Sequence, residues 1–589
     1  MGDIYFQKAR LQSTSEAWMR QPMRIALGLR AVFHEGYGKA DLFRDLAAGA
    51  VVGVVAIPLS MALAMATGVP PQHGLYTAIA AGGITAAFGG SRVQVSGPTA
   101  AFVVILAPIV AKFGLGGLAV ASLMAGLILM IMGVAGLGRL IEFVPFPVTS
   151  GFTAGIGVVI ATLQVKDFLG LQIAHMPDHY VYKVAAIAQA LPTVHWADTL
   201  IGASTLLLLI LVPRVIKTVP APLLVLPIVT LVAYLVDRLI PGLDIATINN
   251  HFSYTVGGVA HPGIPQMLPP FGAPWTEPGA DGQPLGLSFD LIRELLPAAM
   301  TIATLAAIES LLSAVIADGM TGHKHNPDAE LMALGTGNVA ATFLGGFAAT
   351  GAIARTAANV RFGARSPIAA ITHAIVVLLS VIVFAPLLGY LPIAALAGLL
   401  LLVAWNMAEL RHVLYVARIA PRSDVLVLLT CFALTVIFDM VIAVAVGMML
   451  AFLLFAKRMA DVAQIRLVDD QQLSHPELAD KGIVIYEIAG PLFFGAAGKA
   501  VSSLGQIGAN IRMVVFDFRK VPAVDVTGLI NLESAIKKLH AMKIQVVLAG
   551  IGGQPHRALN KAGWGDQDRE LAIFEDFNEA MAFCRAKSA

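Results

Sequence analysis

Two short glycine-containing stretches, set in otherwise apolar sequence, carry residues that could bind an anion. They read GGSRVQVSGPTAAF at residues 89–102 and GGFAATGAIARTAAN at residues 345–359. In each, a glycine pair precedes a few residues that could run extended and then small residues that favour a helix start. The first N–H groups of a helix lack intrahelical partners, and the aligned peptide dipoles place about half a positive charge there. Two such helix starts facing each other would form an anion site without a metal ion.

The residues at these two predicted helix starts are the candidate anion ligands: Ser96, Gly97, Thr99, Ala352, Ala354 and Arg355. Pro98 suits an opening helical turn because the N–H that proline lacks is not needed there. The Arg355 guanidinium stays charged, and placing it at mid-bilayer costs about 3 kcal/mol, so an anion or a carboxylate is expected beside it. Two alternatives stay open: the small residues only let helices cross closely, or Arg355 reaches the cytoplasmic headgroups near Arg361 and Arg365.

Glu309 is an acidic residue deep in the apolar segment TIATLAAIESLLSAVIADG, residues 301–319. A carboxyl group removed from water is favoured in its protonated form, so it can take up and release a proton. Ser313 follows one helical turn later on the same face. Glu309 and Ser313 are therefore the candidates for coupling to a proton or another cation, although Glu309 could instead be a structural partner of Arg355.

The composition predicts a membrane scaffold for these residues. Of 589 residues, 57% are apolar and only 13% are charged, against about 25% charged residues in soluble proteins. The mean hydropathy of +0.78 indicates a polytopic membrane protein. The net charge of +2 gives no basis for nucleic-acid binding, which needs a clustered basic face.

Fourteen apolar segments are predicted between Leu46 and Phe455. The Lys and Arg residues between segments concentrate on one side, which is expected to be cytoplasmic together with both termini. The connection 241–290 is then external, and no removable signal peptide is expected at residues 1–43. The segments begin near residues 46, 74, 97, 117, 144, 183, 221, 291, 331, 352, 367, 391, 424 and 441.

The pattern changes after Arg458 to that of a soluble α/β domain. Strand-like runs at 483–490, 511–518 and 545–551 alternate with a helical segment at 527–542, and a final pair of helices is expected. We expect a cytoplasmic N-terminal segment, a membrane domain, a linker and an α/β domain at residues 1–43, 44–458, 459–481 and 482–589.

Four long motifs resemble the SulP anion transporters, also called solute carrier family 26: TGVPPQHGLYTAIAA (67–81), SRVQVSGPTAAFVV (91–104), AIESLLSAVIADGMTGHKH (307–325) and ATGAIARTAANVRFGARSPIAA (349–370). The resemblance implies two inverted repeats of seven segments, a core domain that moves against a gate domain, and a cytoplasmic STAS domain. It also implies that the third and tenth segments meet head to head around the substrate.

Carried over by position, Arg355 matches the anion-facing arginine of the family, and Glu309 matches its acidic coupling position. Ser313 matches a hydroxyl that helps to hold sodium in bicarbonate-transporting relatives. Ala352 and Ala354 replace serines of some animal relatives, and Leu59 replaces a common glutamine. The stretches at 164–180, 263–270 and 400–409 most resemble the bacterial C4-dicarboxylate transporter of the family.

The resemblance implies proton-coupled uptake of succinate, fumarate or aspartate across the inner membrane by alternating access. The alternatives are sulfate transport or sodium-coupled bicarbonate transport, and, in another class, a membrane-anchored STAS sensor. An enzyme is not expected, since the sequence shows no nucleotide-binding glycine loop, metal cluster or activated nucleophile. No cofactor or metal is predicted, and Asp318, His323, Lys324 and His325 are expected to form a solvated loop.

The STAS domain resembles bacterial anti-sigma antagonists in which a serine after an aspartate is phosphorylated. Here Val526 follows Asp525, so no phosphoryl switch is expected at that position, and the Thr527 hydroxyl is expected to cap the next helix. The resemblance further implies a homodimer embedded in membrane lipid and acyl carrier protein as a partner of the STAS domain.

Overall fold

A computed structural model describes residues 25–139, 144–173, 176–177, 179–216, 219–240, 242–256, 259–438, 440–462, 464–467, 482–493, 511–564 and 571–588. Contacts divide the chain into two units, Met1–Met448 and Met449–Ala589, and each is described by itself. Two predicted segments, 1–43 and 459–481, lie partly outside the described residues.

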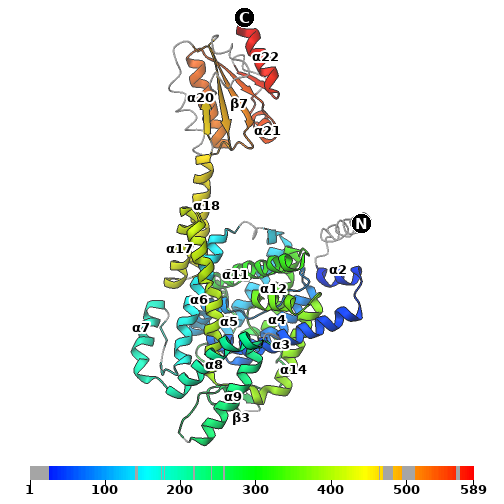
Figure 1. The fold of residues 1–589 in the computed structure, drawn as a ribbon, viewed down its shortest axis with the longest axis vertical. Helices are drawn as coiled ribbons and strands as arrows, with labels where there is room; N and C mark the ends of the chain where they lie inside the picture. The colour runs from blue at the N-terminus through cyan, green and yellow to red at the C-terminus, as the bar shows by residue number, and fades with distance from the viewer. Residues whose placement is uncertain are drawn as a thin grey trace. The chain divides into compact units, whose positions relative to one another are not determined.

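The first unit is a bundle of helices, many of them apolar throughout (Figure 1). Within the described residues, nine helices are long and apolar enough to cross a membrane. The helices are α2 (Leu27–Glu35), α3 (Lys39–Thr67), α4 (Pro71–Phe88), α5 (Ala100–Val134), α6 (Phe146–Phe168), α7 (Tyr180–Ala190), α8 (Trp196–Val215), α9 (Ala221–Leu239), α10 (Ile248–His251), α11 (Phe289–Thr321), α12 (Pro327–Phe343), α13 (Ile353–Arg361), α14 (Pro367–Leu388), α15 (Ile393–Ala408), α16 (Leu410–Ile419), α17 (Arg422–Ile437) and α18 (Met440–Val462).

Several of these helices start where the sequence supplies a cap. The side chains of Ser288, Asn326 and Ser366 accept hydrogen bonds from backbone N–H groups in the first turns of α11, α12 and α14. Proline occupies the first or second position of α4, α6, α9, α12 and α14, where its missing N–H costs nothing. These starts set where the helices that surround the two glycine-rich stretches begin.

The segments predicted to begin near residues 97 and 117 form one continuous element, α5, with a break at Gly114. Gly114 has φ 70° and ψ −168°, which is not helical. A Cβ placed there would lie 2.3 Å from the carbonyl carbon of Gly279. Only glycine fits this position without a shift of the neighbouring backbone, so the break separates the two predicted segments.

The prediction of a spanning segment near residue 183 was wrong. Residues in this region form α7, an 11-residue helix, which is followed by a 3-10 turn at Leu191–Thr193. Pro192 lies in that turn and cannot continue a helix interior. The apolar helix long enough to span is α8, which begins at Trp196.

The two halves of the bundle pack against each other reciprocally. α14 of the second half packs on α3 and α4 of the first half, while α5 of the first half packs on α11 and α12 of the second. In the same way α6 packs on α15 and α17, and α8 packs on α15. Each half therefore supplies walls around the glycine-rich stretch of the other.

The predicted external connection 241–290 contains little regular structure among its described residues. It includes α10, a hairpin of β2 (Ser253–Val256) and β3 (Val259–Pro262), and a 3-10 turn at Pro274–Thr276. Trp275 packs edge to face on Phe343 at the end of α12. This connection thus covers the end of the helix that leads into the second glycine-rich stretch.

The second unit is an α/β domain with the sheet order β5-β6-β7-β8-β9 among its described residues. β5 (Gln464–Leu467) is antiparallel to β6 (Ile483–Ala489), and β6, β7 (Met513–Lys520), β8 (Gln545–Ala549) and β9 (Leu571–Phe574) are parallel. The helices are α20 (Val526–Ala541), α21 (Gly553–Lys561) and α22 (Phe577–Ser588). Separate apolar clusters cover the two faces of the sheet.

Three details of this domain differ from the expectations. β5 falls within the segment 459–481 that was expected to be a linker. The expected final pair of helices, α21 and α22, is separated by an additional strand, β9. The cap of α20 is Asp525, whose Oδ1 accepts from the Gly528 N–H at 2.6 Å, because the helix begins one residue before Thr527.

Candidate anion-binding site

The two glycine-rich stretches meet in a short antiparallel pairing. β1 (Ser96–Gly97) pairs with β4 (Thr350–Gly351). α5 begins just after β1, with Thr99 as its N-cap, and α13 begins just after β4, with Ala352 as its N-cap. The N-terminal ends of both helices therefore lie beside the same pairing, which brings their unpaired N–H groups and positive dipole ends together.

Backbone and side-chain hydrogen bonds hold the first stretch against the start of α13. The Ala352 N–H donates to the Val95 carbonyl at 2.8 Å, and the Val95 N–H donates to Thr356 Oγ1 at 3.0 Å. Asn359 Nδ2 donates to the Val93 carbonyl at 2.9 Å. The backbone at Val93 and Val95 is thus bonded to α13 and its N-cap, which belong to the other half.

The second stretch is held by three side chains and one backbone carbonyl, which come from four helices. Each of residues 347–350 makes a hydrogen bond to a buried group of α4, α5, α11 or α12. The bonds are Phe347 N to Thr77 Oγ1 (2.9 Å), Ala348 N to Ser122 Oγ (3.0 Å), Ala349 N to Asn338 Oδ1 (2.7 Å), Asn338 Nδ2 to the Ala349 carbonyl (3.1 Å) and Thr350 Oγ1 to the Ala306 carbonyl (2.9 Å). This anchoring fixes where α13 starts.

Arg355 is buried beside the pairing, with only 4% of its surface exposed. Its Nη2 donates to the Pro98 carbonyl, while Nε and Nη1 have no hydrogen-bond partner among the described residues. Among those residues no ion pair joins Arg355 to Glu309. The guanidinium therefore does not reach the headgroups near Arg361, and two of its nitrogens remain available for an anion.

Further buried polar groups near the pairing have atoms without hydrogen-bond partners in the described part of the chain. Two of these groups are the Ser96 hydroxyl and the imidazole of His373 on α14, and both residues are at most 2% exposed. A Cβ at Gly82 would lie 2.9 Å from the Ser96 carbonyl and 3.8 Å from His373 Nδ1, so α4 passes close to both. Buried polar atoms are nearly always paired, so these atoms mark a place for water or an anion.

The predicted coupling residues lie directly behind the start of α5. Thr99 Oγ1 donates to Glu309 Oε2 at 3.0 Å, which joins the N-cap of α5 to the acidic residue of α11. Ser313 Oγ donates to Thr356 Oγ1 at 3.0 Å, so Ser313 contacts α13. Glu309 and Ser313 therefore both face the site, each toward a different helix start.

Ala352 and Ala354 offer no side-chain ligand, and they differ in exposure. Ala352 is buried, and its N–H is already bonded to Val95, whereas Ala354 is exposed. Any contact of these alanines with an anion would use backbone N–H groups. The serines of some relatives would add hydroxyl donors here, which this chain lacks.

Sequence reasoning missed several residues that shape the site. Gln94 Nε2 donates to Ser310 Oγ at 2.6 Å, which ties the first stretch to α11 beside Glu309. Gln94 and Asn359 lie within the quoted motifs. A polar side chain among small residues could have indicated that each of them makes a buried hydrogen bond. His373 stands alone in an apolar segment and gave a weaker signal.

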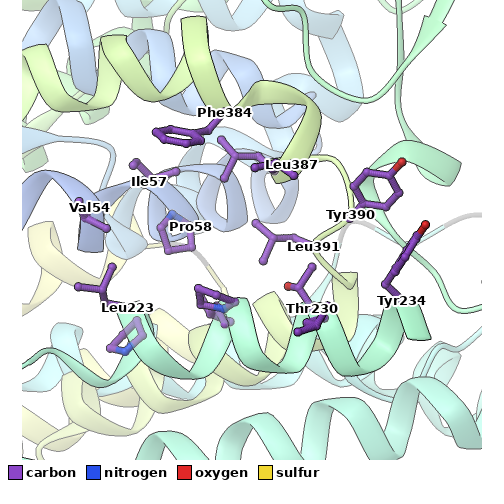
Figure 2. A pocket seen from close by; sticks show the side chains of 15 residues that line it. Val54, Ile57, Pro58, Leu223, Thr230, Tyr234, Phe384, Leu387, Tyr390 and Leu391 are labelled. Carbon is purple, nitrogen blue, oxygen red and sulfur yellow. The ribbon is translucent and has the colours of Figure 1, made fainter. Parts of the chain in front are cut away.

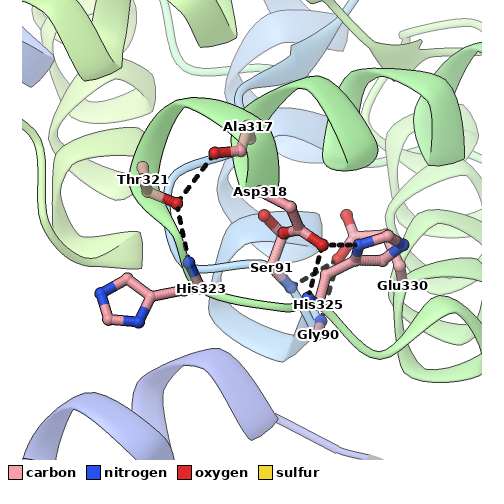
Figure 3. Close-up of polar contacts among 8 residues, drawn as sticks. All are labelled: Gly90, Ser91, Ala317, Asp318, Thr321, His323, His325 and Glu330. Carbon is pink, nitrogen blue, oxygen red and sulfur yellow. Dashed lines mark hydrogen bonds and ion pairs between the residues drawn. The ribbon is translucent and has the colours of Figure 1, made fainter.

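The predicted solvated loop before α12 is exposed at its tip, but Asp318 and His325 are bonded to each other and partly buried (Figure 3). His325 Nδ1 lies 2.8 Å from Asp318 Oδ2, and the His325 side chain is 8% exposed. Glu330 Oε2 accepts from the Gly90 and Ser91 N–H groups, both at 2.9 Å. Together these bonds fix the glycine pair that opens the first stretch.

Of the four residues predicted in that loop, His323 and Lys324 are exposed. No group of three or more His, Cys, Asp or Glu side chains within the described residues could hold a metal ion. The site thus contains helix starts, one guanidinium, hydroxyl groups and one carboxyl group, which suits an anion and a proton.

Comparison with known proteins identifies both parts of the chain. Residues 42–431 match the sulfate permease family and residues 478–580 match the STAS domain. YvdB of Bacillus subtilis, which carries a provisional sulfate-transporter name, is 39% identical over 92% of this chain and 98% of its own length. The bicarbonate transporter BicA of Picosynechococcus is 28% identical over 88% of this chain and 90% of its own length.

Solved structures share the fold. The murine Slc26a9 anion transporter, in an inward-facing state, has a TM-score of 0.81 at 18% identity and covers 95% of this chain and 94% of its own. The transmembrane domain of a cyanobacterial BicA has a TM-score of 0.57 at 27% identity, over 70% of this chain and 98% of its own. Since these relatives are named for sulfate and bicarbonate, a C4-dicarboxylate preference stays a prediction. This chain belongs to the sulfate permease family of multi-pass anion transporters, known as SulP or solute carrier family 26, and carries the C-terminal STAS domain.

Proposed function

We propose that this chain is a secondary active transporter that takes up a small anion together with a proton by alternating access. The observation that carries the proposal is the buried Arg355, which has two unpaired nitrogens beside two helix N-termini. A permanently charged group in this position needs a negative partner. The anion would bind between the starts of α5 and α13, at Ser96, Gly97, Thr99, Ala352, Ala354 and Arg355.

Glu309 would couple the proton to the anion through Thr99. When Glu309 is ionised, its charge lies within hydrogen-bond distance of the helix start that would hold the anion. Two negative groups so close repel each other in a medium of low dielectric constant. Protonation of Glu309 removes that repulsion, so proton and anion would bind together and leave together. Ser313 would take part in cation binding if sodium replaces the proton.

The proposed substrate class is C4-dicarboxylates such as succinate, fumarate or aspartate. Leu59 supports this choice because it is apolar, lies in α3 and packs against the main apolar cluster. A dicarboxylate has an apolar spine that tolerates such a neighbour, whereas sulfate would lose the polar contact of the family's glutamine. Sulfate and bicarbonate are second candidates, since YvdB and BicA are named for them.

Uptake into liposomes tests both the substrate and the coupling. Purified protein would be reconstituted, and labelled succinate, sulfate and bicarbonate would be offered with and without an inward proton gradient, and separately with a sodium gradient. We expect succinate uptake that rises with the proton gradient. Succinate uptake that is the same with and without the proton gradient would overturn the proposed proton coupling. Uptake of sulfate but not of succinate would overturn the proposed substrate class. A membrane-anchored STAS sensor would take up none of the three.

The remaining proposals concern location and partners. We propose an inner-membrane location with both termini cytoplasmic, based on the distribution of Lys and Arg. A homodimer and a regulatory contact of the STAS domain with acyl carrier protein rest on the family resemblance. Mass photometry of the purified protein and pull-down with acyl carrier protein would test these two partners.

A further inference from the structure

A second cavity, of about 580 Å³, lies apart from the anion site, between α3, α9 and the end of α14 (Figure 2). Its volume falls within the range of about 300–1,000 Å³ typical of sites for small molecules. Among the described residues no charged side chain lines it, and the polar side chains that do are those of Thr230, Tyr234 and Tyr390. Such a wall suits an apolar ligand and would not stabilise the anion that the transporter carries.

Prolines help to form the groove. Pro58 lies inside α3 and Pro227 lies inside α9, and both line the cavity. A proline within a helix removes a backbone hydrogen bond and bends the helix. Pro58 and Pro227 thus place two ring side chains, which are short and carry no hydrogen-bonding group, on the wall of the groove.

The cavity opens sideways, toward the place where lipid surrounds the bundle. Leu231 of α9 and Phe384 and Leu387 of α14 line it, yet they are 58%, 52% and 64% exposed. Around spanning helices, apolar side chains that are exposed in this way face hydrocarbon. The cavity is therefore continuous with the acyl region of the membrane.

One end of the groove carries polar groups of the kind found at the membrane surface. The rings of Tyr234 and Tyr390 pack edge to face with their centroids 5.3 Å apart, and both hydroxyls stand at this end (Figure 2). The guanidinium carbon of Arg238 lies 5.4 Å from the centre of the Tyr234 ring. Tyrosine and arginine are enriched at the level of lipid headgroups, and Arg binds phosphate well.

The groove is long enough for an acyl chain that enters it from one leaflet. Leu223 and Tyr234 line it and lie about three helical turns apart along α9, which is roughly 16 Å at 1.5 Å per residue. Half of the hydrocarbon core is about 15 Å thick. Arg238 follows Tyr234 by one more turn, at the level where a headgroup phosphate would lie.

We propose that this groove is a binding site for one acyl chain of a membrane phospholipid. The chain lies along α9 between α3 and α14, and the phosphate contacts Arg238 and the hydroxyls of Tyr234 and Tyr390. The lipid belongs to the leaflet at the C-terminal end of α9, which the charge distribution predicts to be the outer one. The proposal does not depend on which anion the protein carries.

Photo-crosslinking of the full chain in phosphatidylcholine vesicles tests the site. The vesicles would contain a small fraction of phosphatidylglycerol with a diazirine in the middle of one acyl chain, and mass spectrometry would locate the crosslinked peptides. The test variant is Leu231→Trp, which places a large side chain in the groove. The matched control is Leu235→Trp, one turn further along α9, where Leu235 is 48% exposed but does not line the groove.

We expect crosslinks concentrated on peptides that contain residues 54–58, 223–234 and 384–391. Leu231→Trp should lower them about tenfold, which corresponds to a loss of about 1.4 kcal/mol in binding, and Leu235→Trp should not. Arg238→Gln, at an exposed position, should also lower them and provides a second test if Leu231→Trp does not fold. Crosslinks spread evenly over the lipid-facing helices, or equal signals in Leu231→Trp and Leu235→Trp, would overturn the proposal.

Discussion

The hydroxyl of Thr99 donates a hydrogen bond to Glu309 Oε2 across 3.0 Å, although the two residues are 210 positions apart in the chain. Thr99 is the N-cap residue of α5, and its side chain does not cap its own helix. A change in the charge of Glu309 therefore directly changes the electrostatic potential at the start of α5. The account of coupled transport rests on this contact.

Glu309→Gln should remove the pH dependence of transport and spare anion binding. The amide cannot ionise, yet it can still accept the Thr99 hydrogen bond, so the site stays assembled in the state that favours an anion. Uptake in liposomes at several external pH values is the measurement. Glu294→Gln is the control, because Glu294 lies on the same helix but is exposed and pairs with Lys112. A pH profile of Glu309→Gln that follows wild type would contradict the assignment.

Leu59→Gln should shift selectivity from succinate toward sulfate. The substitution restores the polar side chain that resembles the family's glutamine, and a site that offers a hydrogen bond favours a ligand able to accept it. Competition of unlabelled sulfate against labelled succinate gives the ratio of apparent affinities, and we expect it to change by about tenfold. If the ratio of the two apparent affinities does not change, Leu59 does not determine which substrate is bound. Leu59→Met, which keeps the position apolar, should behave as wild type.

Asp45→Ala should destabilise the first unit by about 3 kcal/mol. The Asp45 carboxylate is fully buried and accepts from the N–H groups of Arg365 and Ser366, at 2.7 and 3.2 Å, and from the Tyr37 hydroxyl at 2.6 Å. Burial, followed by the hydrogen bond to Asp45, raises the pKa of Tyr37 to about 12, so this hydroxyl remains a donor. Thermal unfolding in detergent would show the loss. Asp41→Ala, at a more exposed pair with Arg365, should cost much less.

Glu35→Gln should reveal a stability term that depends on pH. The hydrogen bond from Arg92 is the main cause that lowers the pKa of Glu35 below its ordinary value of 4.5. A carboxyl whose pKa is lower in the folded protein stabilises it above the unfolded pKa, and that contribution disappears as pH falls through the folded pKa.

Wild type and Glu35→Gln should therefore differ in melting temperature at neutral pH and converge as the pH falls below the lowered pKa of Glu35 in the folded protein. The difference in free energy should stay below about 1 kcal/mol because the Glu35 side chain is 38% exposed. Thermal melts across this pH range are the measurement. A difference in melting temperature that grows as the pH falls would show that ionised Glu35 does not stabilise the folded protein.

The sequence predicted the two helix starts better than it predicted the bonds that support them. Paired glycine-rich stretches with small residues and proline mark interrupted helices locally, so the starts of α5 and α13 could be placed within a few residues. The bonds that hold the stretches, such as Gln94 to Ser310 and Asn359 to Val93, join residues more than 200 positions apart. A local sequence pattern cannot show which distant residues will bond to each other. A polar residue in a motif indicates only that it has a hydrogen-bond partner somewhere in the fold.

The errors have local physical causes. The sequence after Tyr180 stays apolar through Pro192, so a single long helix was expected there. The helix ends before Pro192, because a proline cannot continue a helix interior. Thr527 was expected to cap α20, yet Asp525 stands two residues earlier and provides a carboxylate at the N-cap position. The loop with Asp318 and His325 is polar in composition, and the pattern does not show that these two side chains bond to each other while His323 and Lys324 stay exposed.

The central claim is that Arg355, beside the paired helix starts, binds the transported anion. Thermal unfolding of purified Arg355→Gln, with Arg361→Gln as an exposed control on the same helix, would be followed as succinate, sulfate or bicarbonate is added. A ligand at about 100 times its Kd stabilises the folded state by about 2.7 kcal/mol. The account predicts this anion-dependent rise in wild type and Arg361→Gln, a weaker rise in Arg355→Lys, and none in Arg355→Gln. An Arg355→Gln protein that is stabilised by the anion as strongly as wild type would contradict it.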